Sequence, residues 1–369
     1  MRAATGLRVR SCVPRSDTTR ETDPSARSWA SVPAAGDVQY IQLGDLKVSR
    51  LGFGCDQLGG HAWGRVDPAE VQRSVETAVD LGVTLFDTAD CYGRGQSEIR
   101  LGQALGARRK DVAIATKFGL RLDRDGVASR DNSAVWFEKA LAASLRRLRT
   151  DYIDLYQVHY WDGTTPWEEI FTRLERKREA GVIRWYGVTN ELITAEMLPT
   201  RPMGCVSCSF EFSLANRSNQ PRIESMRTQW ELGFLSWGSL GQGVLSGKYA
   251  SIDGLGQEDR RRRPVYANFR GDGLVRNLGL VEQLRDRLFR YPGATTAQIA
   301  IRWILDRFDF SIALVGAKTR QQARENAGAV DLRLTESDIA LLSRLTSERA
   351  PSGSPTSDEP AACDARSTS

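Results

Sequence analysis

The sequence of 369 residues contains only two histidines. It also has no hydrophobic run of about 18 residues, the length at which a helix can span a membrane. The charge balance is close to even, because 51 basic residues face 46 acidic ones and the two signs mostly alternate along the chain. We therefore expect neither a membrane span nor a nucleic-acid partner.

Cysteine is scarce as well, with six residues in no regular framework. Cys205 and Cys208 have the spacing of a zinc or redox pair, but no second pair of this kind accompanies them. Their neighbours are those of a buried strand, and zinc sites of this type need further ligands. We expect the two cysteines to pack in the core, and we expect no metal site.

Both ends of the chain lack the hydrophobic patterning of a folded domain. Residues 1–37 are rich in Arg, Ser, Thr and Pro and contain no apolar segment of the kind that a secretory signal requires. Acidic residues also interrupt this segment, which argues against a transit peptide. We expect residues 1–37 and 347–369 to be a disordered N-terminal and a flexible C-terminal tail, and residues 38–346 to be one domain of a cytoplasmic protein.

No glycine-rich dinucleotide fingerprint follows an early strand, which counts against a Rossmann fold. Instead, short and continuously apolar segments alternate with amphipathic ones. The expected strands are Leu51–Phe53, Val83–Phe86, Val112–Thr116, Ile153–Val158, Val182–Val188, Cys205–Ser209, Gly233–Ser236 and Ser311–Val315. The expected helices include one that begins at Asp67-Pro68, and Ser97–Leu105, Ser133–Leu148, Pro166–Ala180, Thr194–Leu198, Glu224–Leu232 and Thr295–Arg307.

Strands that are apolar throughout, with crossover helices between them, indicate a parallel sheet buried on both faces. Eight such units predict an α/β fold of the closed (β/α)8 TIM barrel type. Two extended runs, Val38–Leu43 and Lys47–Ser49, flank Gly44-Asp45 and predict a hairpin. We expect this hairpin to cap the N-terminal end of the barrel and Thr335–Leu345 to form an extra C-terminal helix.

Active sites of such barrels lie at the C-terminal ends of the strands. Asp87, Lys117 and His159 directly follow predicted strands, and Tyr92 lies five positions after Asp87. The other residues at strand ends are Thr189 with Asn190, Ser209, Trp237, and Gly316 with Lys318. Each of these has an ordinary structural explanation, as a turn residue, a buried ion pair or a core histidine. Their coincidence at strand ends favours a catalytic site.

The chemistry of four residues supports that interpretation. A phenol has a pKa near 10, which the ammonium of Lys117 would lower at Tyr92, while Asp87 would hold Lys117 in place. His159 could donate a hydrogen bond to a carbonyl oxygen of a substrate. The set can protonate an oxygen and stabilise a developing alkoxide, but none of it can supply a hydride, so a nicotinamide cofactor is expected.

Six ordered stretches give the chain a clear resemblance to the aldo-keto reductases. They are 86–98 (Phe-Asp-Thr-Ala-Asp-Cys-Tyr-Gly-x-Gly-x-Ser-Glu), 116–119, 145–159, 187–190, 241–249 and 316–328, within about residues 38–346. The catalytic Asp, Tyr, Lys and His of that family correspond to Asp87, Tyr92, Lys117 and His159. The resemblance implies reduction of an aldehyde or ketone, with a small-molecule carbonyl compound as the substrate.

The resemblance also implies how NADPH, or less often NADH, is bound. Thr189 and Asn190 match residues that hold the carboxamide, and Trp237 lies where an aromatic ring stacks on the nicotinamide. The loop Leu240–Ser246 is expected to run along the pyrophosphate, and Gly238 is also expected to bind the cofactor. The adenosine-phosphate stretch contains Gly316, Lys318, Gln322, Glu325 and Asn326. Lys318 there would neutralise a 2′-phosphate, which favours NADPH. Ser209 departs from the family's glutamine, which puts its contact with the carboxamide in doubt.

Aromatic residues near the expected mouth of the site suggest the substrate. Trp63 and Trp161 are expected to shape its pocket, and indoles suit sugar-type carbonyls as well as aryl ones. The basic run 260–263 lies in a long loop that often covers the cofactor in this family, although its composition favours a mobile solvated loop. Three alternatives stay open: an aldose dehydrogenase working oxidatively, an NADP-binding redox-sensing subunit of a protein complex, and a lyase or isomerase barrel.

Overall fold

The structure is a computed structural model, and it describes residues 39–60, 62–64, 66–123, 127–194, 196–198, 200–287 and 290–347. The predicted N-terminal tail, residues 1–37, lies outside the described residues, and so do residues 348–369 of the predicted C-terminal tail 347–369; Ser347 is the last residue of a helix. Within the described part of the chain, the helices are all too short or too polar to cross a membrane.

Eight parallel strands close into a barrel, which confirms the predicted (β/α)8 TIM barrel fold. The strands are β3 (Leu51–Gly54), β4 (Leu85–Asp87), β5 (Ala113–Phe118), β8 (Ile153–Val158), β9 (Ile183–Thr189), β10 (Cys205–Glu211), β11 (Gly233–Trp237) and β12 (Ser311–Gly316). They follow one another around the barrel in chain order, and β12 pairs with β3 to close it. Every residue of β5, β8 and β10 is buried, which explains why their apolar residues do not alternate with exposed polar ones.

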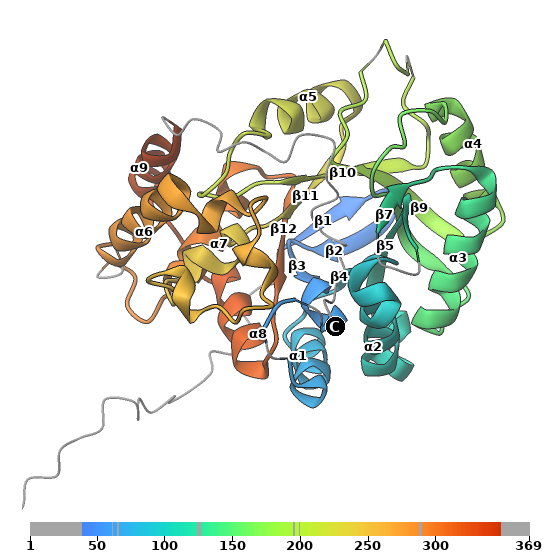
Figure 1. Ribbon diagram of the computed structural model, residues 1–369. Helices are drawn as coiled ribbons and strands as arrows, with labels where there is room; N and C mark the ends of the chain where they lie inside the picture. The colour runs from blue at the N-terminus through green and yellow to red at the C-terminus, as the bar shows by residue number, and fades with distance from the viewer. Residues whose placement is uncertain are drawn as a thin grey trace, which may run out of the picture. The chain divides into compact units, whose positions relative to one another are not determined.

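Helices surround the strands on the outside of the barrel (Figure 1). They are α1 (Pro68–Asp80), α2 (Gln96–Leu105), α3 (Ala134–Leu148), α4 (Trp167–Glu179), α5 (Gln220–Trp230), α6 (Gly271–Arg285), α7 (Thr296–Arg307), α8 (Arg320–Ala327) and α9 (Glu336–Ser347). The α1 helix begins as predicted, with the Asp67 side chain accepting from the Ala69 N–H and Pro68 in the first turn. Glu70 does not complete a capping box, because it binds Arg73 instead.

Some of the elements between the barrel strands differ from those predicted from the sequence. Residues 194 and 196–198 do not form the predicted helix: the N–H groups of Met197 and Leu198 both donate to the Thr194 carbonyl oxygen in a single turn. The α5 helix begins four residues before its predicted start. A short hairpin of β6 (Leu120–Leu122) and β7 (Ala128–Arg130) was not predicted, nor was α6. Three glycines interrupt the hydrophobic pattern of α6, and they lower its apparent helix propensity.

The predicted N-terminal hairpin is present as β1 (Tyr40–Leu43) and β2 (Leu46–Ser49). Gly44 makes its tight turn with a φ of 62°, where a side chain would also strike the indole of Trp185. Leu43, Leu46 and Val48 are buried together with apolar side chains that point into the barrel from its strands. The hairpin therefore closes the N-terminal end of the barrel, and the opposite end is left for the site.

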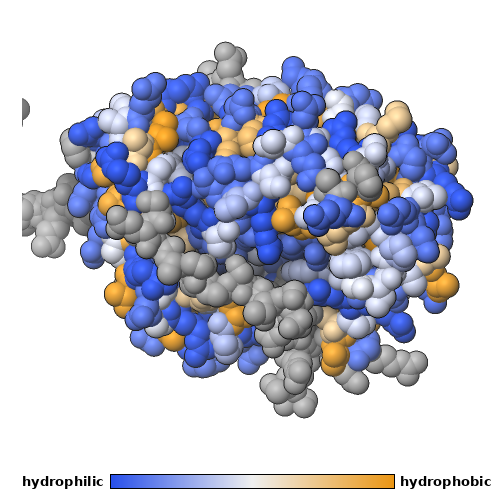
Figure 2. Space-filling view, turned by 90° about the horizontal axis from the view of Figure 1, so that it is seen from above, coloured by the Kyte–Doolittle hydropathy of each residue, from blue (hydrophilic) through white to orange (hydrophobic). Residues whose placement is uncertain are grey.

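The surface seen from above is mainly hydrophilic, with hydrophobic residues in small separate groups among the coloured atoms (Figure 2). The large hydrophobic side chains that are exposed on the described residues, such as Val135 and Met203, belong to different elements. Single exposed apolar residues are normal on a protein surface, and they mark no binding face here.

A buried carboxylate ties the neighbouring strands β5, β8 and β9 together. Asp154 on β8 is 1% exposed and forms ion pairs with Arg109, at 2.7 Å, and with Arg184, at 3.3 Å. It also accepts a hydrogen bond of 2.9 Å from the backbone N–H of Ile114 on β5. These partners offset the cost of desolvating its charge.

We predict that Asp154→Ala lowers the free energy of unfolding by about 3–5 kcal/mol, because it leaves a mostly buried arginine without its partner. Urea denaturation measures the effect. The matched control is Asp80→Ala, which removes a carboxylate that is 66% exposed and paired with Arg108. Its loss is expected to cost about 1 kcal/mol or less. Equal losses in the two variants would contradict the role assigned to Asp154.

Candidate active site

A cavity of about 350 Å³ lies at the C-terminal ends of the strands. The ends of seven strands contribute to its wall: Gly54, Asp87, Lys117, Thr189, Ser209, Trp237 and Gly316. Tyr92 and Trp63 also line it, as do Asn190, Gly238, Leu240, Lys318, Gln322, Glu325 and Asn326. The structure thus brings together all the residues predicted for the site except His159, which lies just behind the wall, and Trp161.

Lys117 and Asp87 form a buried ion pair at the base of the cavity. The Lys117 Nζ lies 2.6 Å from the Asp87 Oδ1, and the two residues are 2% and 4% exposed. Lys117 also donates to the Thr88 carbonyl oxygen, at 2.8 Å, and Gln157 donates to the Asp87 Oδ2, at 3.2 Å. These bonds satisfy both charges and fix the position of the ammonium group.

Tyr92 is held beside this pair by a tight backbone contact. Gly93 has a φ of 56° and packs so closely on Gly59 that a Cβ there would lie 2.4 Å from the Gly59 carbonyl oxygen. This contact ties the turn that carries Tyr92 to the loop that follows β3. The Lys117 Nζ is 5.2 Å from the centre of the Tyr92 ring.

The pKa of Tyr92 is raised well above its ordinary value, first by burial and then by the negative charges of Asp87 and Asp56. This is the opposite of the predicted lowering by Lys117. The reason is that Asp87 cancels the Lys117 charge at close range, so burial dominates. The Tyr92 phenol is therefore fully protonated at neutral pH, which is the form that a proton donor needs.

His159 lies directly behind Tyr92, and it is 3% exposed. Its ring meets that of Tyr92 edge-on at a centroid distance of 5.9 Å and stacks on that of Tyr160 at 4.9 Å. Burial and the nearby positive charge of Lys117 lower the pKa of His159 well below its ordinary value. The imidazole is therefore neutral and carries one N–H donor.

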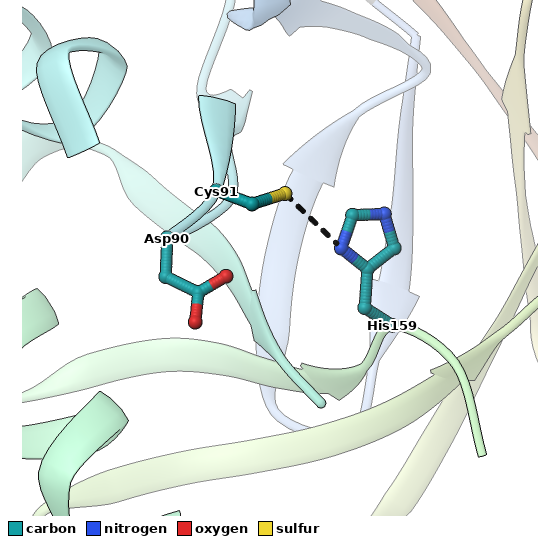
Figure 3. Close-up of side chains that lie close together, drawn as sticks. All are labelled: Asp90, Cys91 and His159. Atoms are coloured by element: carbon teal, nitrogen blue, oxygen red, sulfur yellow. Dashed lines mark hydrogen bonds between the residues drawn. The ribbon is translucent and has the colours of Figure 1, made fainter. Parts of the chain in front are cut away.

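His159 also lies beside Asp90 and Cys91 (Figure 3). The Cys91 Sγ is 3.7 Å from the His159 Nδ1, and one potential ligand atom from each of the three residues lies within 4.8 Å of the others. Burial, followed by the Glu98 charge, raises the pKa of Asp90 well above its ordinary value. Because metal ligands must be deprotonated, the raised pKa of Asp90 makes this set unsuited to a metal ion.

The wall formed by β9, β10 and β11 presents amide and hydroxyl groups. Asn190, with a φ of 66°, donates to the His159 carbonyl oxygen and accepts a hydrogen bond of 3.1 Å from the Trp237 indole. The Thr189 Oγ1 is buried and has no hydrogen-bond partner. Ser209 donates to the Leu235 carbonyl oxygen at 3.0 Å, so its hydroxyl can only accept from a ligand.

The opposite wall, near the start of α8, is positively charged. Burial, together with the charges of Lys248 and Arg261, lowers the pKa of Lys318. All three cations line the cavity. Gln322 accepts from the Lys318 backbone N–H at 2.8 Å, and Lys318 itself donates to the Trp63 carbonyl oxygen at 2.9 Å. Such a cluster is suited to an anionic group, since several donors converge on one space.

The loop between β11 and α6 folds over this cavity. Arg260 and Arg261 are 3% and 5% exposed. Arg260 pairs with Asp56 at 3.1 Å, and its backbone N–H donates to the Ala62 carbonyl oxygen at 2.8 Å. Arg261 donates to the Tyr249 hydroxyl at 2.7 Å. The interpretation of this basic run as a mobile solvated loop is therefore wrong, because aromatic and acidic partners bury its first two guanidinium groups.

The two tryptophans predicted to shape the pocket occupy different places. Trp63 lines the cavity and lies under Arg260 and Arg261, whose guanidinium carbons are 5.2 and 5.4 Å from its ring. The Trp161 indole instead donates to the Thr165 carbonyl oxygen at 2.7 Å and stacks on Trp167. It points towards α4 rather than into the cavity.

Several residues that line or support the site were not predicted from the sequence, among them Asp56, Gln57 and Gln157. Asp56 and Gln57 follow β3 and line the cavity, and Gln157 holds Asp87 from β8. Asp56 and Gln57 follow the end of a predicted strand. The rule that active-site residues of barrels lie at the C-terminal ends of strands, which predicted Asp87, could therefore also have predicted them. Gln157 lies inside a strand, and its polar side chain among apolar neighbours was the available signal.

We predict that the His159 imidazole stays unprotonated at about pH 5.5, where an ordinary histidine is mostly charged. The unfolded chain takes up a proton as the pH falls through about 6.5 and the folded chain does not, so folding stability falls below that pH. Nitrogen-15 NMR of the ring measures the protonation directly. His159→Gln should flatten the loss of stability between about pH 6.5 and 5.5, and a charged ring at pH 5.5 would contradict the prediction.

Comparison with known proteins agrees with this geometry. Residues 50–346 match the model of the Aldo/keto reductase family. An aldo-keto reductase of Schizosaccharomyces pombe whose name specifies NADP(+) is 33% identical over 310 residues, which cover 81% of this chain and 88% of that protein. The structure of a glycerol dehydrogenase from Gluconobacter oxydans superposes with a TM-score of 0.73 at 27% identity, covering 86% of this chain and 98% of that one.

A second solved structure, an aldo-keto reductase from Klebsiella pneumoniae in complex with NADPH, has a TM-score of 0.63 at 25% identity. It covers 86% of this chain and 97% of its own. The family model spans most of the sequence, and these relatives match over nearly their whole length. The chain belongs to the aldo/keto reductase family.

Proposed function

We propose that this protein is an NADPH-dependent oxidoreductase that reduces an aldehyde or ketone to the alcohol, with Tyr92 as the general acid. The observation that carries the proposal is the position of Tyr92 in the cavity wall. A protonated phenol lies there between a buried Lys117–Asp87 pair and a neutral imidazole. Proton donation to a carbonyl oxygen is the chemistry that this group performs best.

The cavity suits a nicotinamide dinucleotide at both of its ends. The unpartnered Thr189 Oγ1 and the amide of Asn190 offer hydrogen bonds to a carboxamide, and Trp237 offers an aromatic face. At the other end, Lys318, Lys248 and Arg261 would bind phosphate groups, and Lys318 favours NADPH over NADH. The cofactor, when bound, supplies the hydride that no side chain can provide.

The residues of the chain perform the proton transfer. Tyr92 donates its hydroxyl proton to the carbonyl oxygen as negative charge develops there, since an alkoxide is more basic than a phenolate. The fixed ammonium of Lys117 stabilises the resulting phenolate, and burial strengthens that attraction. A neutral His159 donates a hydrogen bond towards the same oxygen and orients the carbonyl group.

The likeness to a glycerol dehydrogenase supports a second candidate, in which the same site oxidises a polyol or an aldose. Tyr92 then accepts the proton, by microscopic reversibility. The hypothesis of a redox-sensing subunit gains no support from the described residues, since the catalytic group is complete among them. The cytoplasmic location stays a prediction, which cell fractionation would test.

We predict that Tyr92→Phe lowers kcat for NADPH-dependent reduction of an accepted aldehyde by about 10²–10⁴-fold, because it removes the hydroxyl group that donates the proton and keeps the ring. NADPH oxidation at 340 nm measures turnover, with NADH in parallel to test the cofactor preference. The matched control is Tyr40→Phe on the N-terminal hairpin, which should leave turnover unchanged. Undiminished turnover in Tyr92→Phe would exclude this role for Tyr92.

A further inference from the structure

The turn that carries Tyr92 has a backbone conformation that needs support from outside the turn. Gly93, Arg94 and Gly95 have φ values of 56°, 55° and 88°, so three successive residues lie in the left-handed region. That region is unfavourable for a residue with a side chain, such as Arg94. A conformation of this kind persists only where the surrounding structure holds it.

A pair of buried hydroxyl groups joins the two ends of this turn. Thr88 directly follows β4 and Ser97 lies in the first turn of α2, and both are 0% exposed. The Thr88 Oγ1 lies 2.8 Å from the Ser97 Oγ, which in turn lies 2.6 Å from the Cys55 carbonyl oxygen. A carbonyl oxygen only accepts, so Ser97 donates to Cys55 and Thr88 donates to Ser97. We call these two hydrogen bonds the hydroxyl bridge.

The hydroxyl bridge is anchored at both of its ends to the Lys117–Asp87 pair. The Thr88 carbonyl oxygen accepts a hydrogen bond of 2.8 Å from the Lys117 Nζ. At the other end, the Cys55 N–H donates to the Asp87 carbonyl oxygen, also at 2.8 Å. The bridge therefore ties the turn that carries Tyr92 to the same backbone groups that hold the buried ion pair.

Building on the function proposed above, we propose that Thr88 and Ser97 are positioning residues whose hydroxyl bridge sets the place of the Tyr92 phenol relative to Lys117. Both side chains lie outside the residues that form the cavity wall, so they act through Tyr92 and Lys117 and touch neither substrate nor NADPH. Proton transfer depends steeply on the geometry of donor and acceptor. Loss of the bridge should therefore slow the chemical step and leave substrate and cofactor binding unchanged.

The test removes one hydroxyl group at a time. A single turnover of NADPH oxidation with an accepted aldehyde reports the chemical step, because product release does not then limit the rate. Ser97→Ala and Thr88→Val should each slow this step by about 10–100-fold, since a displacement of about 1 Å can cost that much. Thr88→Ser keeps the hydroxyl group and should stay close to the wild-type rate. The KM of the aldehyde and the dissociation constant of NADPH should not change in any of these variants.

The double variant Ser97→Ala/Thr88→Val tests whether the two hydroxyl groups act as one unit. Each single change already breaks the bridge, so the double variant should be about as slow as the slower single variant. Losses that multiply would show two independent contributions and would contradict a common bridge.

Ser311→Ala is the matched control for stability. Ser311 is also 0% exposed, and its hydroxyl donates to the Phe308 carbonyl oxygen at 2.7 Å, but it begins β12 at the opposite end of the barrel. This variant should lose stability in urea, as Ser97→Ala does, and should keep the wild-type single-turnover rate. Equal slowing in Ser311→Ala, or wild-type rates in both Ser97→Ala and Thr88→Val, would overturn the proposal and leave the bridge with a structural role only.

Failure of the proposed function gives a different result, because Tyr92→Phe would then react at the wild-type rate. If only the bridge is wrong, Tyr92→Phe is slow and the hydroxyl variants are not. If Ser97→Ala does not fold, Thr88→Val and Thr88→Ser decide the matter, since only the second keeps the hydroxyl group. Equal single-turnover rates in these two variants would reject the bridge.

Discussion

The buried ion pair between Lys117 and Asp87 is the interaction on which the site depends. Both charges lie almost fully out of water, at adjacent strand ends, where an unpaired charge would destabilise the barrel. The pair fixes an ammonium group beside Tyr92, yet its net charge is close to zero. This neutrality leaves the Tyr92 phenol protonated and lets burial govern its pKa.

The covering loop depends on a second set of buried charges. Arg260 and Arg261 are held by Asp56, Asp259 and Tyr249, and they enclose Trp63. The loop thereby connects the positively charged wall, through Lys318 and Trp63, to the loop that carries Asp56.

Much of this arrangement could be predicted from the sequence, because strands buried on both faces are continuously apolar and their ends mark a barrel's active site. That rule found Asp87, Lys117, Thr189 and Trp237. The direction of the Tyr92 pKa shift could not be predicted, since it depends on distances between three charges. The burial of Arg260 and the direction of the Trp161 side chain depend on tertiary contacts that no local pattern records.

The central claim is that the Lys117–Asp87 pair serves catalysis as well as the fold. The most direct measurement is NADPH-dependent turnover, together with unfolding by urea, in Lys117→Met and in the double variant Lys117→Met/Asp87→Asn. Lys117→Met should lose both stability and turnover, because it leaves a buried carboxylate unpaired. The double variant should regain stability while turnover stays at least about 100-fold below wild type. Recovery of turnover together with stability would show that the pair is only structural and would contradict the account.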